Sequence, residues 1–189
     1  MEYKTIKIGN QVWMLENLNV SCFRNGDLIS EVVDKKIWSN ADIEKIPAWC
    51  HYDDDQQYET QYGKLYNWYA VNDPRGLAPE GFHIPSNQEF SDLIEYLGGD
   101  KIAGKELKHS EIWFHIIPAT NSSGFSALAG GSKNVNGSCG MLGHYGIFWT
   151  ATESDEWDAC FKRLHYDDDG IYNGSYRKTN GYSVRCIKD

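Results

Sequence analysis

Aromatic residues and glycines set the strongest limit on what this chain can fold into. Its 189 residues include 7 Trp, 12 Tyr, 7 Phe and 18 Gly. Each ring buries a large area and glycine lets the backbone turn sharply, so the combination suits short strands and irregular loops packed on one another. We therefore do not expect long helices to dominate. Tight turns with positive φ are expected at four Asn-Gly dipeptides, which begin at Asn25, Asn136, Asn173 and Asn180.

The charge of the chain argues against nucleic acid as a partner. Eighteen Lys and Arg against 27 Asp and Glu give a net charge of −9, and a surface of that sign repels phosphate. No apolar run approaches the roughly 18 residues that a membrane span needs, so we expect no membrane span. Residues 1–8 alternate like a strand and lack the apolar segment of a secretory signal. Either the protein is not exported or a leader has been removed.

Local patterns in the first half predict one hairpin and a first helix. Residues 5–8 and 11–14 flank Gly9-Asn10, which has the composition of a two-residue hairpin loop. Polar and acidic stretches over 21–62 indicate a segment that is mostly loop. Apolar residues at helical spacing predict a helix over 62–71.

A second helix is expected after Pro85. Ser86 and Glu89 form a capping box, in which each side chain bonds the backbone amide of the other residue. Gly98-Gly99 supplies a left-handed exit. The apolar stripe that follows the capping box is expected to face the core and consists of Phe90, Leu93, Ile94 and Leu97.

Beyond Ile116 the sequence indicates strands and loops. Residues 146–152 read as a dense strand, 160–166 alternate imperfectly, and Tyr182, Val184 and Cys186 share one face of a final strand. The whole chain, 1–189, is therefore predicted to be one α+β domain, with two helices packed on a mainly antiparallel twisted sheet and extensive loops.

The cysteines do not indicate a zinc site. Cys22, Cys50, Cys139, Cys160 and Cys186 are widely spaced, with no Cys-x-x-Cys and no Cys and His pair at ligand spacing. We interpret them mainly as small buried hydrophobic residues, with one disulfide as the alternative.

Six segments in a fixed order resemble the Fibrobacter succinogenes major paralogous domain. They are IGNQVWMLENLN at 8–19, YGKLYNWYAV at 62–71, PEGFHIPS at 79–86, NSSGFSALAGG at 121–131, FWTATE at 148–153 and GYSVRC at 181–186. Relatives commonly carry Cys-Pro where this chain has Ala78-Pro79, so the disulfide that this cysteine could form with the position of Cys186 is impossible here. The chain also has Ala129 where relatives have proline.

The resemblance implies a C-type-lectin-like fold and a secreted or surface-anchored protein of Bacteroidetes or related bacteria. It implies no activity, because the wider fold hosts sugar binders, protein binders, variable receptors and formylglycine-generating enzymes. We therefore expect an extracellular or cell-surface protein that binds a glycan or a protein. The alternatives are a receptor diversified by a retroelement and an enzyme related to the formylglycine-generating enzymes.

The sequence holds no common catalytic signature. It lacks a Gly-x-Ser-x-Gly elbow, a phosphate-binding Gly-rich loop and a His-Glu-x-x-His motif. His83 is expected to be a hydrogen-bonded structural histidine. Cys50 and His51 are adjacent, and neighbours on an extended chain point apart, so we assign no catalytic residue. No cofactor is expected, with calcium as an alternative at three acidic segments, 53–55, 155–158 and 167–169.

The segment from Glu153 to Tyr182 is the predicted ligand-binding surface. It combines aromatic rings with short polar side chains, the mixture of adaptable binding surfaces. The alternative is that Tyr and Asn only line twisted hairpins, and a diversified receptor would vary at several of the same positions and at Ser175. The candidate residues are Glu153, Asp155, Trp157, Asp158, Tyr166, Asp168, Tyr172, Asn173, Tyr176, Arg177 and Asn180.

Overall fold

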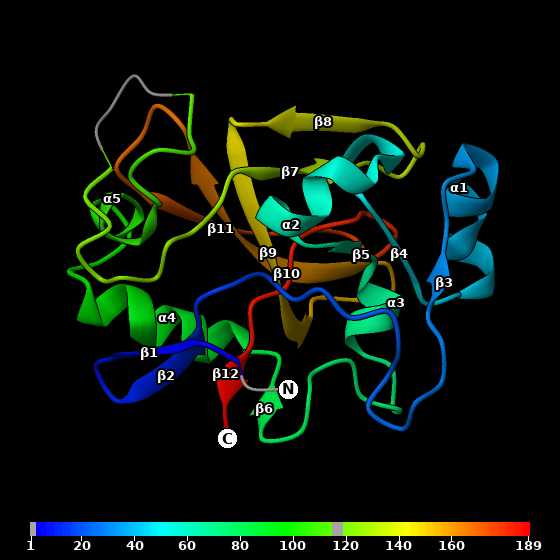
Figure 1. The fold of residues 1–189 in the computed structure, drawn as a ribbon, viewed down its shortest axis with the longest axis horizontal. Helices are drawn as coiled ribbons and strands as arrows, with labels where there is room; N and C mark the ends of the chain where they lie inside the picture. Colours follow the sequence, from blue (N-terminus) through cyan, green and yellow to red (C-terminus); the bar gives the residue numbers. More distant parts are fainter. Residues whose placement is uncertain (1–2, 115–118) are drawn as a thin grey trace.

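A five-stranded sheet in the order β11-β10-β9-β7-β8 forms the centre of the fold (Figure 1). The computed structural model describes residues 3–114 and 119–189. β9, β10 and β11 form an antiparallel meander, and the β7–β8 hairpin joins β9 in parallel. The strands are β7 (Gly130–Lys133), β8 (Cys139–Leu142), β9 (Tyr145–Glu153), β10 (Asp158–His165) and β11 (Ile171–Arg177).

Two smaller sheets flank this centre. One has the order β1-β2-β12-β6 and brings the two ends of the chain together, while the other has the order β3-β4-β5. The first contains β1 (Thr5–Ile8), β2 (Gln11–Met14), β6 (Phe82–His83) and β12 (Ile187–Lys188). The second contains β3 (Ser30–Glu31), β4 (Ala48–Cys50) and β5 (Leu65–Tyr66).

The helices are short, and the α+β class is confirmed. The described residues contain α1 (Lys35–Glu44), α2 (Glu59–Tyr62), α3 (Trp68–Val71), α4 (Asn87–Tyr96) and α5 (Ala103–Leu107), with 3-10 turns η1 (Tyr52–Asp54) and η2 (Gln56–Tyr58). The expectation of two helices is therefore wrong. The lectin-like assignment within this class stays a prediction.

Helix α1 lies in the segment that was expected to be mostly loop. Asp34 caps it by accepting hydrogen bonds from the amides of Lys36 and Ile37. Only Trp38 and Ala41 of its residues are buried. The polar composition that suggested a loop is the solvent face of this helix.

The single helix predicted over 62–71 is wrong. Gly63 adopts φ +69°, and a Cβ there would lie 2.9 Å from the carbonyl oxygen of Leu18, so the helix ends at Tyr62. Tyr66 instead exchanges backbone hydrogen bonds with Tyr182. Pairing with a distant segment therefore overrides the local helical spacing.

The first hairpin and helix α4 are confirmed. β1 pairs with β2 from Thr5↔Met14 to Ile8↔Gln11, and residues 1–2 lie outside the described range. The capping box of α4 is present on both sides, between Ser86 and Glu89.

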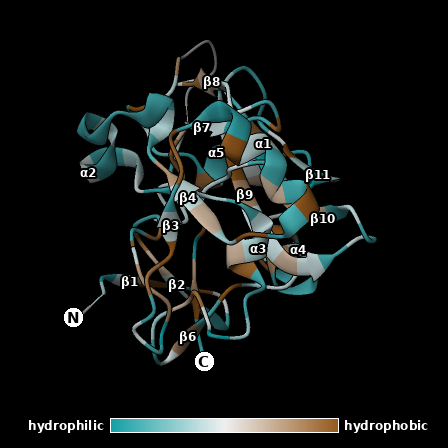
Figure 2. Cartoon of the chain, turned by 90° about the vertical axis from the view of Figure 1, so that its right-hand side faces the viewer, coloured by the Kyte–Doolittle hydropathy of each residue, from teal (hydrophilic) through white to brown (hydrophobic). Residues whose placement is uncertain are grey.

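The described residues form three apolar clusters; the two larger ones are layers on opposite faces of the central sheet, and the third lies around Trp38 and Leu65. Alternation along β9 sends Ile147 and Trp149 into one layer and Phe148 into the other, where α4 also packs. Figure 2 shows apolar colour concentrated in the interior strands and polar colour on α2 at the periphery. Tyr182, Val184 and Cys186 all enter the first layer, which confirms their shared face.

An arginine is buried where the chain ends meet. Arg185 has an exposed fraction of 0%. Its guanidinium donates to the carbonyl oxygens of Met14, Leu15 and Phe125, and to the Asn17 side chain. No carboxylate within the described ranges forms an ion pair with it, so these neutral oxygens are its partners.

Two of the four predicted Asn-Gly turns are confirmed. Gly26 and Gly137 adopt positive φ, whereas the prediction is wrong for Gly174 and Gly181. Gly174 lies inside β11, and a Cβ on it would be 2.7 Å from the ring of Phe161. This glycine is needed for close packing instead of a turn.

All five cysteines are free thiols. Cys50 and Cys186 are buried, as predicted, but Cys22 is exposed. Cys139 and Cys160 are half-buried, so the interpretation as buried hydrophobic residues holds fully for only two of the five. The one-disulfide alternative is wrong in this structure.

Candidate functional site

Side chains that alternate along β10 and β11 share one face of the central sheet. Tyr172 pairs with Arg163, and Gly174 pairs with Phe161. Residues two apart on a strand point to the same side, which adds Tyr176 to this set. We call the surface that these residues form, together with the neighbouring ring of Tyr145, the tyrosine face.

The two outer rings of the tyrosine face are exposed to solvent. Tyr172 is 42% exposed and Tyr176 is 53% exposed. They are four residues apart on a strand, which separates their Cα atoms by about 13 Å. Gly174 lies between them, and the ring of Phe161 packs against it where a side chain would otherwise be. The arrangement is a narrow platform with a ring at each end.

Arg163 lies under this platform without an acidic partner. Its guanidinium carbon is 5.2 Å from the ring centre of Tyr145 and 5.5 Å from that of Tyr172. Its Nε is buried and has no hydrogen-bond partner in the described part of the chain. The Tyr172 hydroxyl donates to Asp168 at 2.6 Å, and this bond raises the pKa of Tyr172. The Tyr172 ring is thus held by the Arg163 guanidinium beside it and by the Asp168 carboxylate at its hydroxyl group.

The β9–β10 hairpin tip is fixed by a buried lysine. The ammonium group of Lys178 donates to the Glu153 carboxylate and to the carbonyl oxygens of Asp155, at 2.7 Å, and Glu156, at 2.8 Å. The Asp155 carboxylate accepts from the amides of Trp157 and Asp158, which lowers the pKa of Asp155. The exposed tip therefore has a defined conformation.

Arg177 connects this tip to helix α1. Its guanidinium lies 2.5 Å from the Asp42 carboxylate and 5.0 Å from the ring centre of Trp157. Trp157 is 45% exposed. The indole is thus presented to solvent at the hairpin tip, with the Arg177 guanidinium packed against it.

The structure separates the remaining candidates. Asn180 is only 1% exposed, so its prediction as a surface residue is wrong; it lies beneath the strands. Asp158 and Tyr166 are half-buried. Asn173 is exposed, but its amide oxygen accepts from the buried Lys162 at 2.5 Å. The carboxylate of Asp168, also half-buried, is engaged by Tyr172 and the Gly170 amide.

The sequence interpretation missed three residues of this region: Tyr145, Arg163 and Lys178. Tyr145 and Arg163 are 18 residues apart in the sequence, and the antiparallel pairing of β9 with β10 brings them together. Lys178 lies inside the predicted segment 153–182 but is buried, and nothing in its local sequence marks it. An arginine in the middle of an alternating strand was the one available signal.

His83 is a structural histidine, as predicted. Its ring nitrogens lie 2.8 Å from Glu89 and 2.8 Å from Asp189. Burial works against protonation of His83, but the hydrogen bonds to the two carboxylates outweigh it and raise the pKa of this histidine.

Replacing His83 by glutamine is expected to lower stability more at pH 5.5 than at pH 8.5. A raised histidine pKa contributes stability below the unfolded value of about 6.5 and loses it as the pH rises through the folded value. Thermal melts of both proteins at the two pH values measure the difference. An equal effect of the substitution at both values would contradict the ion-pair role.

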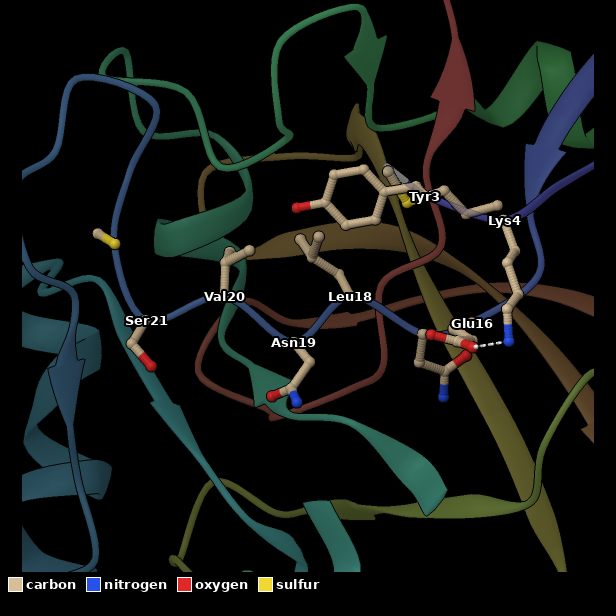
Figure 3. Close-up of a pocket in the computed structure, with 10 residues that line it drawn as sticks. Tyr3, Lys4, Glu16, Leu18, Asn19, Val20 and Ser21 are labelled. Carbon is tan, nitrogen blue, oxygen red and sulfur yellow. Dashed lines mark ion pairs between the residues drawn. The ribbon is translucent and has the colours of Figure 1, made fainter. Parts of the chain in front are cut away.

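In residues 3–114 and 119–189, no three His, Cys, Asp or Glu side chains are grouped to hold a metal ion. The helices of these ranges are too short or too polar to cross a membrane. A cavity of about 590 Å³ lies beside Tyr3 and Leu18, with an exposed ion pair of Lys4 and Glu16 at its rim (Figure 3).

The comparison with known families covers nearly the whole chain. The model of the Fibrobacter succinogenes major domain matches residues 6–188. Searches of curated proteins and of solved structures found no match. The matched range includes the central sheet, the tyrosine face and the buried Arg185. The chain belongs to the Fibrobacter succinogenes major domain family.

Proposed function

We propose that this protein is a noncatalytic binding module of C-type-lectin-like fold that recognises a glycan outside the cell. The observation that carries the proposal is the pair of exposed rings, Tyr172 and Tyr176, with the ring of Phe161 packed against Gly174 between them. Aromatic side chains supply rigid contact area at low entropic cost, and short polar side chains add directional hydrogen bonds. A platform about 13 Å long fits an elongated chain of sugar units.

Arg163 supports this proposal from below the platform. It has no carboxylate within 4.0 Å in the described residues, so its charge is balanced only by the two tyrosine rings. No carboxylate among the described residues therefore competes for its guanidinium with a ligand hydroxyl or carboxylate oxygen. Trp157 at the hairpin tip extends the aromatic surface.

The state of the thiols supports a noncatalytic role. Burial raises the pKa of Cys50 and Cys186, and it also raises those of the half-buried Cys139 and Cys160. A protonated thiol is a poor nucleophile. The enzyme alternative therefore lacks an activated cysteine at these four positions.

Alanine at Tyr172 or Tyr176 is expected to weaken glycan binding about tenfold or more, because central aromatic residues carry most of the affinity of such surfaces. A glycan array identifies the ligand, and titration calorimetry measures its affinity for each variant. Tyr96→Ala is the matched control, since Tyr96 is 66% exposed on helix α4, outside the tyrosine face.

Two results would count against glycan recognition. If the array stays blank and a pull-down captures a protein whose binding is lost in the same two variants, the ligand is a protein. If neither substitution changes binding while Tyr96→Ala does, the tyrosine face is not the binding surface. Unchanged melting temperatures of all three variants are required for either conclusion.

A further inference from the structure

We infer that a second site, a polar cavity beside His51, binds a small organic molecule that carries a primary ammonium group. The cavity holds about 480 Å³, within the range of about 300 to 1,000 Å³ that is usual for small-molecule sites. It lies on the three-stranded sheet and the turns before α2. It shares no residue with the tyrosine face, and this inference does not depend on the proposed function.

The charges around the cavity leave one carboxylate without a lysine. The Lys64 ammonium lies 2.8 Å from Glu59, and the Lys133 ammonium lies 2.6 Å from Asp54. Both lysines are buried. The third carboxylate, Glu31, has a single basic nitrogen within 4.0 Å in the described ranges, His51 Nε2 at 3.9 Å. Glu31 thus has no lysine or arginine partner among the described residues.

His51 is a buried polar group with an unused hydrogen-bonding position. Its exposed fraction is 5%, and Nδ1 has no partner among the described residues. The ring packs edge-on against Trp49 at 5.2 Å and forms part of the cavity wall. Buried polar atoms without partners are rare in folded proteins and recur at functional sites. His51 thus adds a side chain with an unpartnered nitrogen to the cavity wall.

The walls of the cavity are held in fixed positions. Asp53 and Asp54 adopt φ +54° and +55°, a left-handed conformation that costs free energy in residues other than glycine. The contact of Asp54 with buried Lys133 holds this turn against the sheet. Lys64 lies 4.5 Å from the ring centre of Trp49 and also donates to Asn19. A ligand would meet groups that are already oriented.

These groups select the chemistry of the ligand. An ammonium group has three donors and one positive charge, which matches the Glu31 carboxylate and the remaining carboxylate oxygen of Asp54. An anion would be repelled by Glu31. A neutral molecule would leave that charge unpaired. Hydroxyl groups on the ligand suit the other polar wall residues, Ser21 and Gln56.

The test uses the full chain and a matched pair of ligands. Calorimetric titration with glucosamine, which carries the ammonium group, is compared with N-acetylglucosamine, in which acylation removes the charge. We expect glucosamine to bind at least tenfold more tightly. Glu31→Gln is expected to lower glucosamine affinity at least tenfold, whereas Glu16→Gln, on a residue paired with Lys4 elsewhere on the surface, leaves it unchanged.

Several outcomes would overturn the inference. They are the absence of saturable glucosamine binding, equal affinity for both sugars, or unchanged affinity in Glu31→Gln. Glu31 has a half-exposed side chain at 47%, so this variant is expected to fold, and a thermal melt verifies it. The Tyr172→Ala and Tyr176→Ala proteins are expected to keep full glucosamine affinity. Their loss of array binding alone would separate the two sites.

Discussion

Replacing Arg185 by leucine is expected to lower the free energy of unfolding by about 3 to 5 kcal/mol. The guanidinium is fully buried and donates to the carbonyl oxygens of Met14, Leu15 and Phe125. Leucine fills part of the volume but leaves these oxygens buried without a donor. These oxygens belong to two segments that are far apart in the sequence, so the loss of their shared donor weakens both segments together. Urea denaturation followed by tryptophan fluorescence measures the change.

Two further variants complete this test. Lys4→Leu removes a cation whose side chain is 78% exposed, so its effect is expected to stay within about 0.5 kcal/mol. Arg185→Lys retains the charge but lacks the planar set of five donors, so it is expected to recover only part of the loss. A loss below about 1 kcal/mol for Arg185→Leu would mean that the buried acceptors find other donors.

Replacing Gly104 by alanine is expected to destabilise the protein by about 1 to 3 kcal/mol or more. Inside an exposed helix the same change is usually stabilising, by up to about 1 kcal/mol. Here a Cβ would lie 2.0 Å from the carbonyl oxygen of Gly170 and 2.6 Å from that of Asp169. Both atoms are backbone, so helix α5 and the β10–β11 loop must move apart.

The displaced loop also holds Asp168, which accepts from Tyr172. Gly104→Ala is therefore expected to reduce binding at the tyrosine face as well as the melting temperature. Gly140→Ala is the matched control, because a Cβ at Gly140 meets no atom within 4 Å. A Gly104→Ala protein as stable as the wild type would contradict the close packing of these two segments.

The elements that could be predicted from the sequence are those with local causes. The capping box of Ser86 and Glu89 and the first hairpin each depend on a few adjacent residues, and both are confirmed. The helix predicted over 62–71 is wrong because the conformation of this segment depends on Leu18 and Tyr182, which are distant in the sequence. Helix α1 escaped notice because only Trp38 and Ala41 are buried in it, which gives a weak periodic signal.

The candidate binding surface also combines features with local causes, which could be predicted, and features that depend on distant segments, which could not. The exposure of Tyr172 and Tyr176 follows from strand alternation, which the sequence displays, and Trp157 is exposed because it lies at the tip of the β9–β10 hairpin. The prediction for Asn180 is wrong because the burial of a polar amide depends on the segments that pack over it. Arg163 was not predicted because the pairing of neighbouring strands cannot be deduced from adjacent residues. The class of ligand, the expectation of no cofactor and the extracellular or cell-surface location stay predictions.

The His51 cavity illustrates a further limit. Cys50 and His51 were considered only as a nucleophile and its base, a role that adjacent residues on a strand seldom fill. The structure instead gives His51 a neighbour 20 residues earlier, Glu31, through the parallel pairing of β3 and β4. Parallel pairing of two short strands leaves little trace in composition.

The open outer edge of β11 has an evolutionary consequence. Positions 172, 175 and 176 are exposed and belong to neither apolar layer, and surface substitutions of this kind usually change stability by less than about 0.5 kcal/mol. Descendant sequences can therefore exchange these three side chains freely, while Gly174, packed against Phe161, and Asn173, which accepts from the buried Lys162, stay constant. New ligand preferences can accumulate on an inherited scaffold without compensating mutations elsewhere.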